Sequence, residues 1–306
     1  MDILGIQSYS LPNNNWIPLL ASFLELLDDA ASRGTAVGAF TCYDSTQAAG
    51  VLDAAEDAGT GVVLLVSPAS FRARRGADLL TALVAQAAGA ETAVCVQLDH
   101  VSDRATVEAA FAAGAGAVMV DGSHLPLAEN VALTAACVEA GARRGAHVEG
   151  ELGGIAGDED VATAISAGAL TDPRQAADFV RDARPACLAV SIGNVHGHYR
   201  EPPRLDVDRL AAIRAATGAH VSLHGASGLP SAELAAALAA GARKVNVNTE
   251  LRTRYLATLD HGLAGWSGGA NLGALTGAVR DATALAVRET LAVLGGAIGT
   301  SLDSAV

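Results

Sequence analysis

The chain has 306 residues, of which 51% are apolar and 17% charged, so it can bury a sizeable core and is not a disordered protein. Its formal net charge of −13 argues against nucleic acid or an anionic membrane as a partner, because both attract clustered Lys and Arg. Four widely spaced cysteines, with neither an export signal nor a long apolar span, predict a reduced cytoplasmic protein.

The chain begins with an expected irregular arm at residues 1–18, which contains three consecutive Asn and leads into a helix at 19–32. From residue 35 onward, eight short apolar runs alternate with Ala-rich helical stretches, as expected of parallel strands covered by helices. The predicted strands are 35–40, 61–67, 92–99, 116–122, 147–153, 186–193, 220–225 and 244–248. Predicted helices between them include 45–58, 103–113, 126–145, 172–183, 206–217 and 230–240.

Eight strands, each followed by a helix, predict one domain over residues 19–306, an α/β fold of the (β/α)₈ TIM-barrel type. An open doubly wound sheet is the alternative, although it usually has fewer strands. The stretch 262–277 is too glycine-rich for a regular helix and is expected to be a mobile loop, a subunit contact or a plain linker before a final helix at 278–295.

Unusual polar residues cluster at the carboxyl ends of the predicted strands, which is where barrels carry their chemistry. In chain order they are Thr41, Ser67, Asp99, His100, Asp121, Glu149, Glu151, Asn194, His196, His224, Asn246, Asn248 and Thr249. Three of them are histidines from different strands, His100, His196 and His224. Three imidazoles around an open position are typical of a catalytic zinc site, so these residues are the predicted ligands of Zn²⁺. The other five histidines are not expected to bind a metal.

The loops after the last two strands read HGASG (224–228) and NVNTE (246–250). Barrels often bind phosphate there, because small residues let backbone N–H groups approach the oxygens and hydroxyls add donors. Beside a metal histidine, these loops predict a phosphate pocket.

Seven ordered motifs carry a resemblance to a known family. They are QLDH (97–100), VDGSHLPLAEN (120–130), VEGELGGIAGDED (148–160), TDP (171–173), GNVHG (193–197), LHGASG (223–228) and KVNVNTELR (244–252). With these motifs the chain resembles the class II fructose-bisphosphate and tagatose-bisphosphate aldolases over nearly the whole predicted barrel.

The resemblance implies that His100, His196 and His224 hold the zinc, with Asp121 and Glu151 beside it as supporting or alternative ligands. It further implies that Asp99 is the acid/base at the substrate's C4 hydroxyl and that Glu159 moves the proton at the carbanion carbon. The ketone-side phosphate pocket is matched by Gly197, Gly225, Ser227, Asn248 and Thr249, with a monovalent cation, Na⁺ or K⁺, nearby. Ser67 and Asn246, at strand ends, are further candidates for binding the substrate. Arg280 resembles an arginine that reaches the other phosphate across a subunit interface, which implies a homodimer or a larger homo-oligomer.

The chain departs from the family at Thr41, where an Asn usually helps to hold the aldehyde half of the substrate. A threonine lacks the donor and acceptor pair of an amide, so the aldehyde stays open. Asn248 leaves the choice between fructose and tagatose stereochemistry open as well. Two alternatives of another class are a zinc hydrolase on the same scaffold and a noncatalytic relative that binds sugar phosphates.

Overall fold

The computed structural model describes residues 20–155, 164–165, 170–196, 198–199, 204–267 and 271–296. Within these ranges, eight parallel strands close into a barrel in the order β1-β10-β9-β7-β5-β4-β3-β2. Their bounds are β1 Val37–Thr41, β2 Val62–Val66, β3 Val94–Val101, β4 Ala117–Val120, β5 His147–Leu152, β7 Cys187–Val190, β9 His220–Leu223 and β10 Ala242–Val247. The predicted (β/α)₈ barrel and its eight strands are confirmed.

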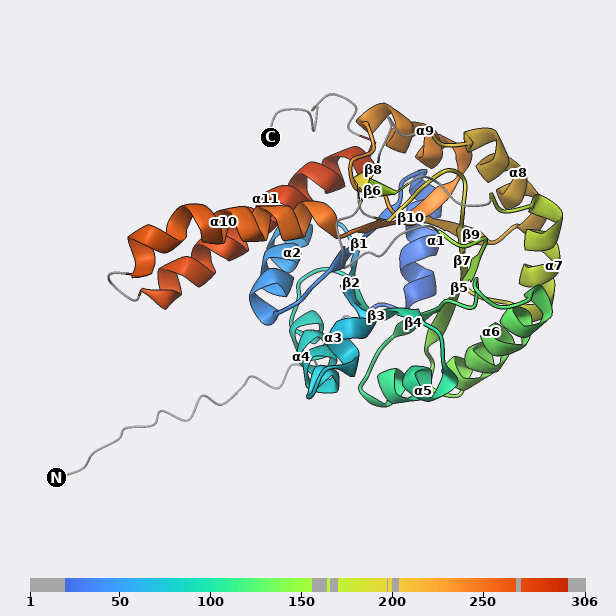
Figure 1. The fold of residues 1–306 in the computed structure, drawn as a ribbon, viewed down its shortest axis with the longest axis horizontal. Helices are drawn as coiled ribbons and strands as arrows, with labels where there is room; N and C mark the ends of the chain where they lie inside the picture. The colour runs from blue at the N-terminus through green and yellow to red at the C-terminus, as the bar shows by residue number, and fades with distance from the viewer. Residues whose placement is uncertain are drawn as a thin grey trace.

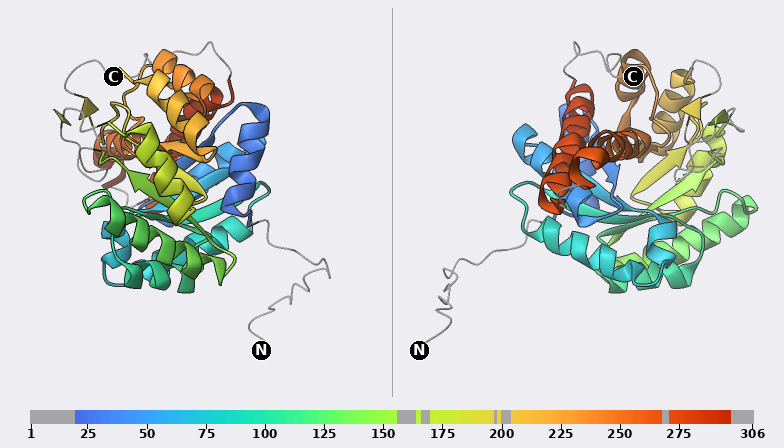
Figure 2. Two further views of the ribbon diagram at one scale, coloured as in Figure 1. Left: turned by 90° about the vertical axis from the view of Figure 1, so that its right-hand side faces the viewer. Right: turned by 60° about the vertical axis from the view of Figure 1, so that its left-hand side comes forward.

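Helices form a layer outside the strands, as Figures 1 and 2 show. Their bounds are α2 Ser45–Ala58, α3 Pro68–Arg72, α4 Gly76–Ala88, α5 Arg104–Ala112, α6 Leu127–Ala142, α7 Pro173–Ala183, α8 Val207–Thr217, α9 Ser231–Ala240, α10 Thr249–Ser267 and α11 Leu272–Leu294. No helical segment of the described residues combines the length and the apolar character that a membrane span requires.

The first helix, α1 (Phe23–Arg33), closes the end of the barrel where the strands begin. Ser22 caps it, because its hydroxyl accepts a bond from the Glu25 N–H while the Glu25 carboxylate accepts one from the Ser22 N–H. The buried face of α1, which includes Phe23 and Leu27, packs against interior residues of the strands. In the left view of Figure 2, α1 lies at one end of the barrel and the short pair β6 (Ala164–Ile165) and β8 (His198–Tyr199) at the other. The sequence did not predict this pair.

Side chains inside the barrel change from apolar near α1 to polar at the opposite end. Every second residue of a strand points inward. The sequence along β3 is therefore Cys95, Gln97 and Asp99, all of them buried. The fold thus delivers polar atoms to the end that α1 leaves open.

One sequence prediction is wrong. The stretch 262–277 is largely helical, because α10 continues to Ser267 and α11 begins at Leu272, so that 268–270 alone fall outside the described residues. Asn271 caps α11 by accepting a bond from the Ala274 N–H at 3.0 Å, and an ion pair of 2.7 Å between Arg254 and Glu289 joins the two helices. Glycine costs about 1 kcal/mol in a helix, which this capping and packing outweigh. The predicted arm at 1–18 lies outside the described residues.

Candidate active site

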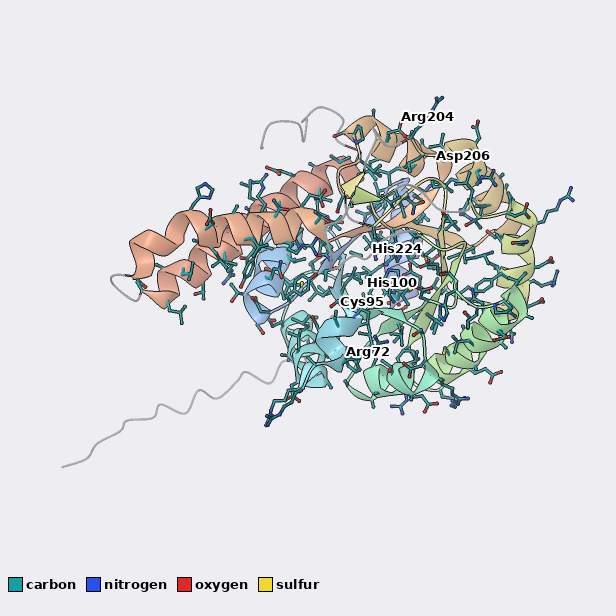
Figure 3. The ribbon with its side chains drawn as sticks, in the orientation of Figure 1. Arg72, Cys95, His100, Arg204, Asp206 and His224 are labelled. Carbon is teal, nitrogen blue, oxygen red and sulfur yellow. The ribbon has the colours of Figure 1, made fainter. Side chains whose placement is uncertain are left out.

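Three histidine side chains meet at the carboxyl end of the barrel. His100 lies near the end of β3, His196 follows β7, and His224 directly follows β9. The ring centroid of His100 is 4.9 Å from that of His196 and 5.0 Å from that of His224, and the latter two are 5.9 Å apart. Figure 3 shows His100 and His224 inside the ring of strands. The three candidate ligand atoms lie within 4.8 Å of one another, so they can share one ion.

Two consecutive residues, Asp99 and His100, both face this cluster because β3 is irregular there. Successive side chains of a regular strand point to opposite faces. The pairing of β3 with β4 shifts between Leu98 and Val101, where three steps along β3 match two along β4. His100 also has a left-handed φ of 41°, which is unusual for a residue other than glycine. The extra residue forms a bulge that turns both side chains toward the site.

Two of the rings bond a carboxylate through one nitrogen and present the other to the cluster. His224 Nε2 lies 2.9 Å from Glu149 Oε1, and His100 Nδ1 lies 3.3 Å from Asp121 Oδ2. The nitrogens that remain, His224 Nδ1 and His100 Nε2, are 3.1 Å apart. Two imidazole ligands of a tetrahedral zinc ion are separated by about 3.3 Å, and metal-bound histidines are typically backed by carboxylates. The donor set and its spacing therefore fit zinc.

Asp121 and Glu151 flank the ring of His100, and with it they form a second group of possible metal donors. Glu151 Oε2 lies 3.6 Å from His100 Nδ1, and Asp121 Oδ1 accepts bonds from the Ser123 N–H and hydroxyl at 3.0 and 2.7 Å. Burial raises the pKa of the Glu151 carboxyl to about 7. Burial also opposes ionisation of Asp121, but the hydrogen bonds from His100 and Ser123 hold its pKa below the usual range. The two neighbours therefore differ in how readily they ionise.

A fully buried ion pair between Glu149 and Lys244 lies below the histidines, and the sequence analysis gave Lys244 no role. Lys244 Nζ is 2.8 Å from Glu149 Oε2, and both side chains are 0% exposed. Burial alone would raise the pKa of Glu149, but Lys244 and His224 outweigh it and hold that pKa well below its usual value. The pKa of Lys244 is raised despite its burial, because Glu149 and Asp99 stabilise its charge. The sequence did contain a signal for this pair, because Lys244 is a charged residue at the start of a predicted buried strand.

Asp99 lies on the inner surface of the barrel at the same level as the histidines. Its Oδ2 accepts a bond of 3.0 Å from Asn246 Nδ2 and lies 4.0 Å from His100 Nε2. Asn246 Oδ1 accepts a bond of 2.6 Å from Lys244 Nζ, which fixes the orientation of the amide. Asp99 is thus held beside the candidate metal position.

The loops after β9 and β10 lie side by side, as expected of a phosphate pocket. Gly225 has a φ of +63°, and a Cβ there would come within 2.0 Å of the Val195 carbonyl oxygen. Ser227 donates a bond of 2.6 Å to Glu250. The amide of Asn248 contacts the hydroxyl of Tyr43, with Nδ2 at 3.0 Å and Oδ1 at 3.2 Å. Thr249, also buried, begins α10.

Three predicted residues have other surroundings, and two more lie outside the part of the chain that the structure describes. Ser67 caps α3, with its hydroxyl accepting a bond of 3.2 Å from the Ser70 N–H. Thr41 is buried at the end of β1, and its Oγ1 has no hydrogen-bond partner in the part of the chain that the structure describes. Arg280 lies on α11 and forms a bidentate pair, at 2.5 Å, with Asp53 of the same chain. Glu159 and Gly197 lie outside the described residues.

Comparisons with known proteins identify the family of this chain. The model of the family described as fructose-bisphosphate aldolase class-II matches residues 21–297. The "Probable fructose-bisphosphate aldolase" of Bacillus subtilis (strain 168) is 36% identical over 235 residues, which are 76% of this chain and 82% of that protein.

Solved structures show the same architecture. The YdjI aldolase from Escherichia coli K12 superposes with a TM-score of 0.80 at 28% identity, covering 90% of this chain and 97% of that one. The fructose-bisphosphate aldolase from Campylobacter jejuni superposes with a TM-score of 0.73 over 88% of this chain and 93% of that one, and at 16% identity it supports the fold alone. Since the family model spans nearly the whole barrel, the chain belongs to the class II fructose-bisphosphate aldolases, a family of lyases that act on ketose phosphates.

Proposed function

We propose that this protein is a zinc-dependent aldolase that reversibly cleaves a ketose bisphosphate, such as fructose 1,6-bisphosphate, to dihydroxyacetone phosphate and an aldehyde. The observation that carries the proposal is the cluster of three imidazoles beside Asp99, with His224 Nδ1 and His100 Nε2 3.1 Å apart. The name of the Bacillus subtilis relative supports fructose 1,6-bisphosphate as the first substrate to test.

In this proposal His100, His196 and His224 hold the zinc ion. When bound, zinc acts as a Lewis acid that stabilises the negative charge developing on the ketone side of the substrate. Asp99 accepts the proton of the C4 hydroxyl as the bond between C3 and C4 breaks, and it returns that proton in the condensation direction. Its buried position next to the histidines, where Asn246 orients it, supports this role.

A second acid is needed, because C3 of the ketone half must be protonated after the C3–C4 bond breaks and before dihydroxyacetone phosphate leaves. We assign this step to Glu159 on the resemblance to the family. We assign the ketone-side phosphate to the loops after β9 and β10, where Gly225 and Ser227 lie next to Asn248 and Thr249. Backbone N–H groups of such loops favour anions even in a protein with a net charge of −13.

The metal requirement is tested by removing and restoring zinc. Purified protein treated with a chelator should lose cleavage of fructose 1,6-bisphosphate, and added zinc should restore it. Turnover that resists the chelator, together with a Schiff base trapped by borohydride, would refute the proposal, because a lysine would then form a covalent bond with the ketone.

The substrate is tested with a panel of ketose phosphates that includes tagatose 1,6-bisphosphate. Thr41 is the residue most relevant to substrate choice, because it departs from the family pattern. Its buried hydroxyl also lacks a hydrogen-bond partner among the described residues. A preference for tagatose 1,6-bisphosphate would keep the mechanism and both products and change only the stereochemistry at C4, whereas a preference for a ketose phosphate that differs beyond C4 would change the aldehyde. Phosphate release without carbon–carbon cleavage would instead indicate a zinc hydrolase, and binding without turnover would indicate a noncatalytic relative.

We also propose that the protein is a homodimer or a larger homo-oligomer. The pair α10 and α11 extends away from the barrel in Figure 1, and Leu256 and Leu272 on this pair are 57% and 69% exposed. Exposed leucines on a projecting pair of helices favour association. The four free thiols suit a reducing compartment such as the cytoplasm. Sedimentation of the purified chain would give its oligomeric state.

A further inference from the structure

The carboxylate of Glu149 has every acceptor position filled by a buried donor. Its Oε1 accepts bonds from Ser222 Oγ at 2.5 Å and from His224 Nε2 at 2.9 Å. Its Oε2 accepts bonds from Gln97 Nε2 and from Lys244 Nζ, each at 2.8 Å. Burying two charges is costly, and a pair of apolar residues would fill the same space at lower cost. So complete a network around one carboxylate indicates a role beyond packing.

Within the Glu149–Lys244 ion pair, Glu149 fixes the ring of His224. An ionised carboxylate can only accept hydrogen bonds, so the proton of the neutral imidazole must reside on Nε2. The lone pair is then on Nδ1, the atom that faces His100 Nε2 across 3.1 Å. Glu149 therefore selects both the orientation and the tautomer in which His224 can bind a metal ion.

Lys244, the other member of the ion pair, fixes Asp99 through the amide of Asn246. An ammonium group can only donate, so Lys244 turns the amide oxygen of Asn246 toward itself, at 2.6 Å. The amide nitrogen is thereby directed to Asp99 Oδ2, at 3.0 Å. If the amide were reversed, its oxygen would face the Asp99 carboxylate and repel it. The single ion pair thus connects a candidate metal ligand with the candidate acid/base.

We propose that the buried Glu149–Lys244 pair is a positioning unit, which presents His224 Nδ1 to the metal and aims the Asp99 carboxylate at the substrate. The part that concerns Asp99 rests on the proposed aldolase function, whereas the part that concerns His224 requires metal binding alone.

The first test is cobalt binding by Glu149→Gln, measured by titrating metal-free protein and recording the visible spectrum of the complex. Glutamine keeps the size of the side chain but loses its charge, and its amide nitrogen cannot accept a bond. The expected result is a 10- to 100-fold weaker affinity, the range known for carboxylates that back a metal histidine, with a changed spectrum. Ser222→Ala is the matched control, because it removes another bond to the same Oε1 and leaves the His224 contact; it should bind cobalt within about threefold of wild type.

A variant that lacks both charges covers the case in which Glu149→Gln alone does not fold. Glu149→Gln combined with Lys244→Met removes the unpaired ammonium while filling its space. The folded double variant should also bind cobalt 10- to 100-fold more weakly. Cobalt binding with the wild-type affinity and spectrum by either variant would overturn the proposal.

The second test separates positioning of Asp99 from binding of substrate by Asn246. At saturating zinc, Asn246→Ala should lower kcat by about 10- to 100-fold, because the acid/base loses its orientation, with KM nearly unchanged. A raised KM with kcat intact would overturn the Asp99 part and make Asn246 a substrate ligand. An inactive wild-type protein would overturn the proposed function and the role of Asp99 with it, while the cobalt titration, which needs no substrate, still decides the role of Glu149.

Discussion

The residue after His224 offers a sharp test of how the metal site is built. Gly225 has a φ of +63°, and a Cβ there would lie 2.0 Å from the carbonyl oxygen of Val195, the residue before His196. Because Cβ atoms essentially never come closer than 3.0 Å to such an atom, Gly225→Ala must separate the two segments by about 1 Å. That separation pulls His224 away from His196. The left-handed backbone costs an alanine a further 1–2 kcal/mol, roughly.

Gly218→Ala is the matched control for this substitution. Gly218 has a φ of +66°, and a Cβ there would meet no atom within 4 Å. It should lose about 1–2 kcal/mol of unfolding free energy while it keeps zinc and activity. Gly225→Ala should lose about 2–5 kcal/mol, since overpacking adds about 1–3 kcal/mol, and a shift of about 1 Å should lower kcat/KM by roughly 100-fold.

The measurements are chemical denaturation of both variants, zinc content by mass spectrometry, and cleavage of fructose 1,6-bisphosphate. If Gly225→Ala matched Gly218→Ala in all three, the close approach of the loop to Val195 could not be what holds the two histidines in place.

Three further predictions concern other parts of the chain. His224→Ala should lose bound zinc and activity. His261→Ala should lose neither, because the His261 ring is exposed on α10 and bonds a carbonyl of its own helix. Metal analysis and an activity assay check both expectations. Fewer than one of the four buried thiols per chain should react with a thiol reagent until the protein unfolds, because burial raises the pKa of each. Asp103→Ala should cost about 1 kcal/mol at pH 7, because Asp103 caps α5 by accepting a bond from the Thr106 N–H at 2.8 Å. That bond lowers the pKa of Asp103 below its ordinary 3.8. The stabilisation is therefore present above pH 3.8 and is lost as the pH falls through the folded-state pKa. Denaturation of the variant and the wild type at pH 7 and at pH 2 to 3 should show that the difference in their unfolding free energies shrinks in acid.

The barrel was predictable because each of its strands is a short apolar run with its own boundaries. The projecting pair α10 and α11 was not, because a count of glycines cannot show that two helices pack against each other. Gly265 illustrates the point, since a Cβ there would meet open space and the residue makes no demand on the backbone. In such a position glycine only weakens the helix, and tertiary packing decides the outcome.

At the site, the rule that chemistry lies at strand ends brought the histidines together but did not predict their orientations. Asp99 and His100 are adjacent, so a regular strand would point one of them away from the site, and the bulge in β3 is the reason that both face it. Arg280 shows the opposite limit. The resemblance implies a partner's phosphate for it, and in the single chain its guanidinium bonds Asp53.

The interior of the barrel has an apolar layer near α1 and a polar layer at the site, and the two layers contribute differently to the positions of the site residues. Near α1 the inward positions of β1 and β2 are apolar, as at Val37 and Val63, and at the carboxyl ends of these strands they become polar, at Thr41 and Ser67. Polar side chains at those positions gain little from burial and depend on one another for hydrogen bonds, so they act as one unit. The strands below fix where each Cβ lies, and the network above fixes where each polar atom points. Substitutions of Asn246, an uncharged member of the network, should therefore alter kcat more than unfolding free energy, whereas substitutions of Phe23 or Leu27 under the barrel should lower the unfolding free energy and leave the metal site intact.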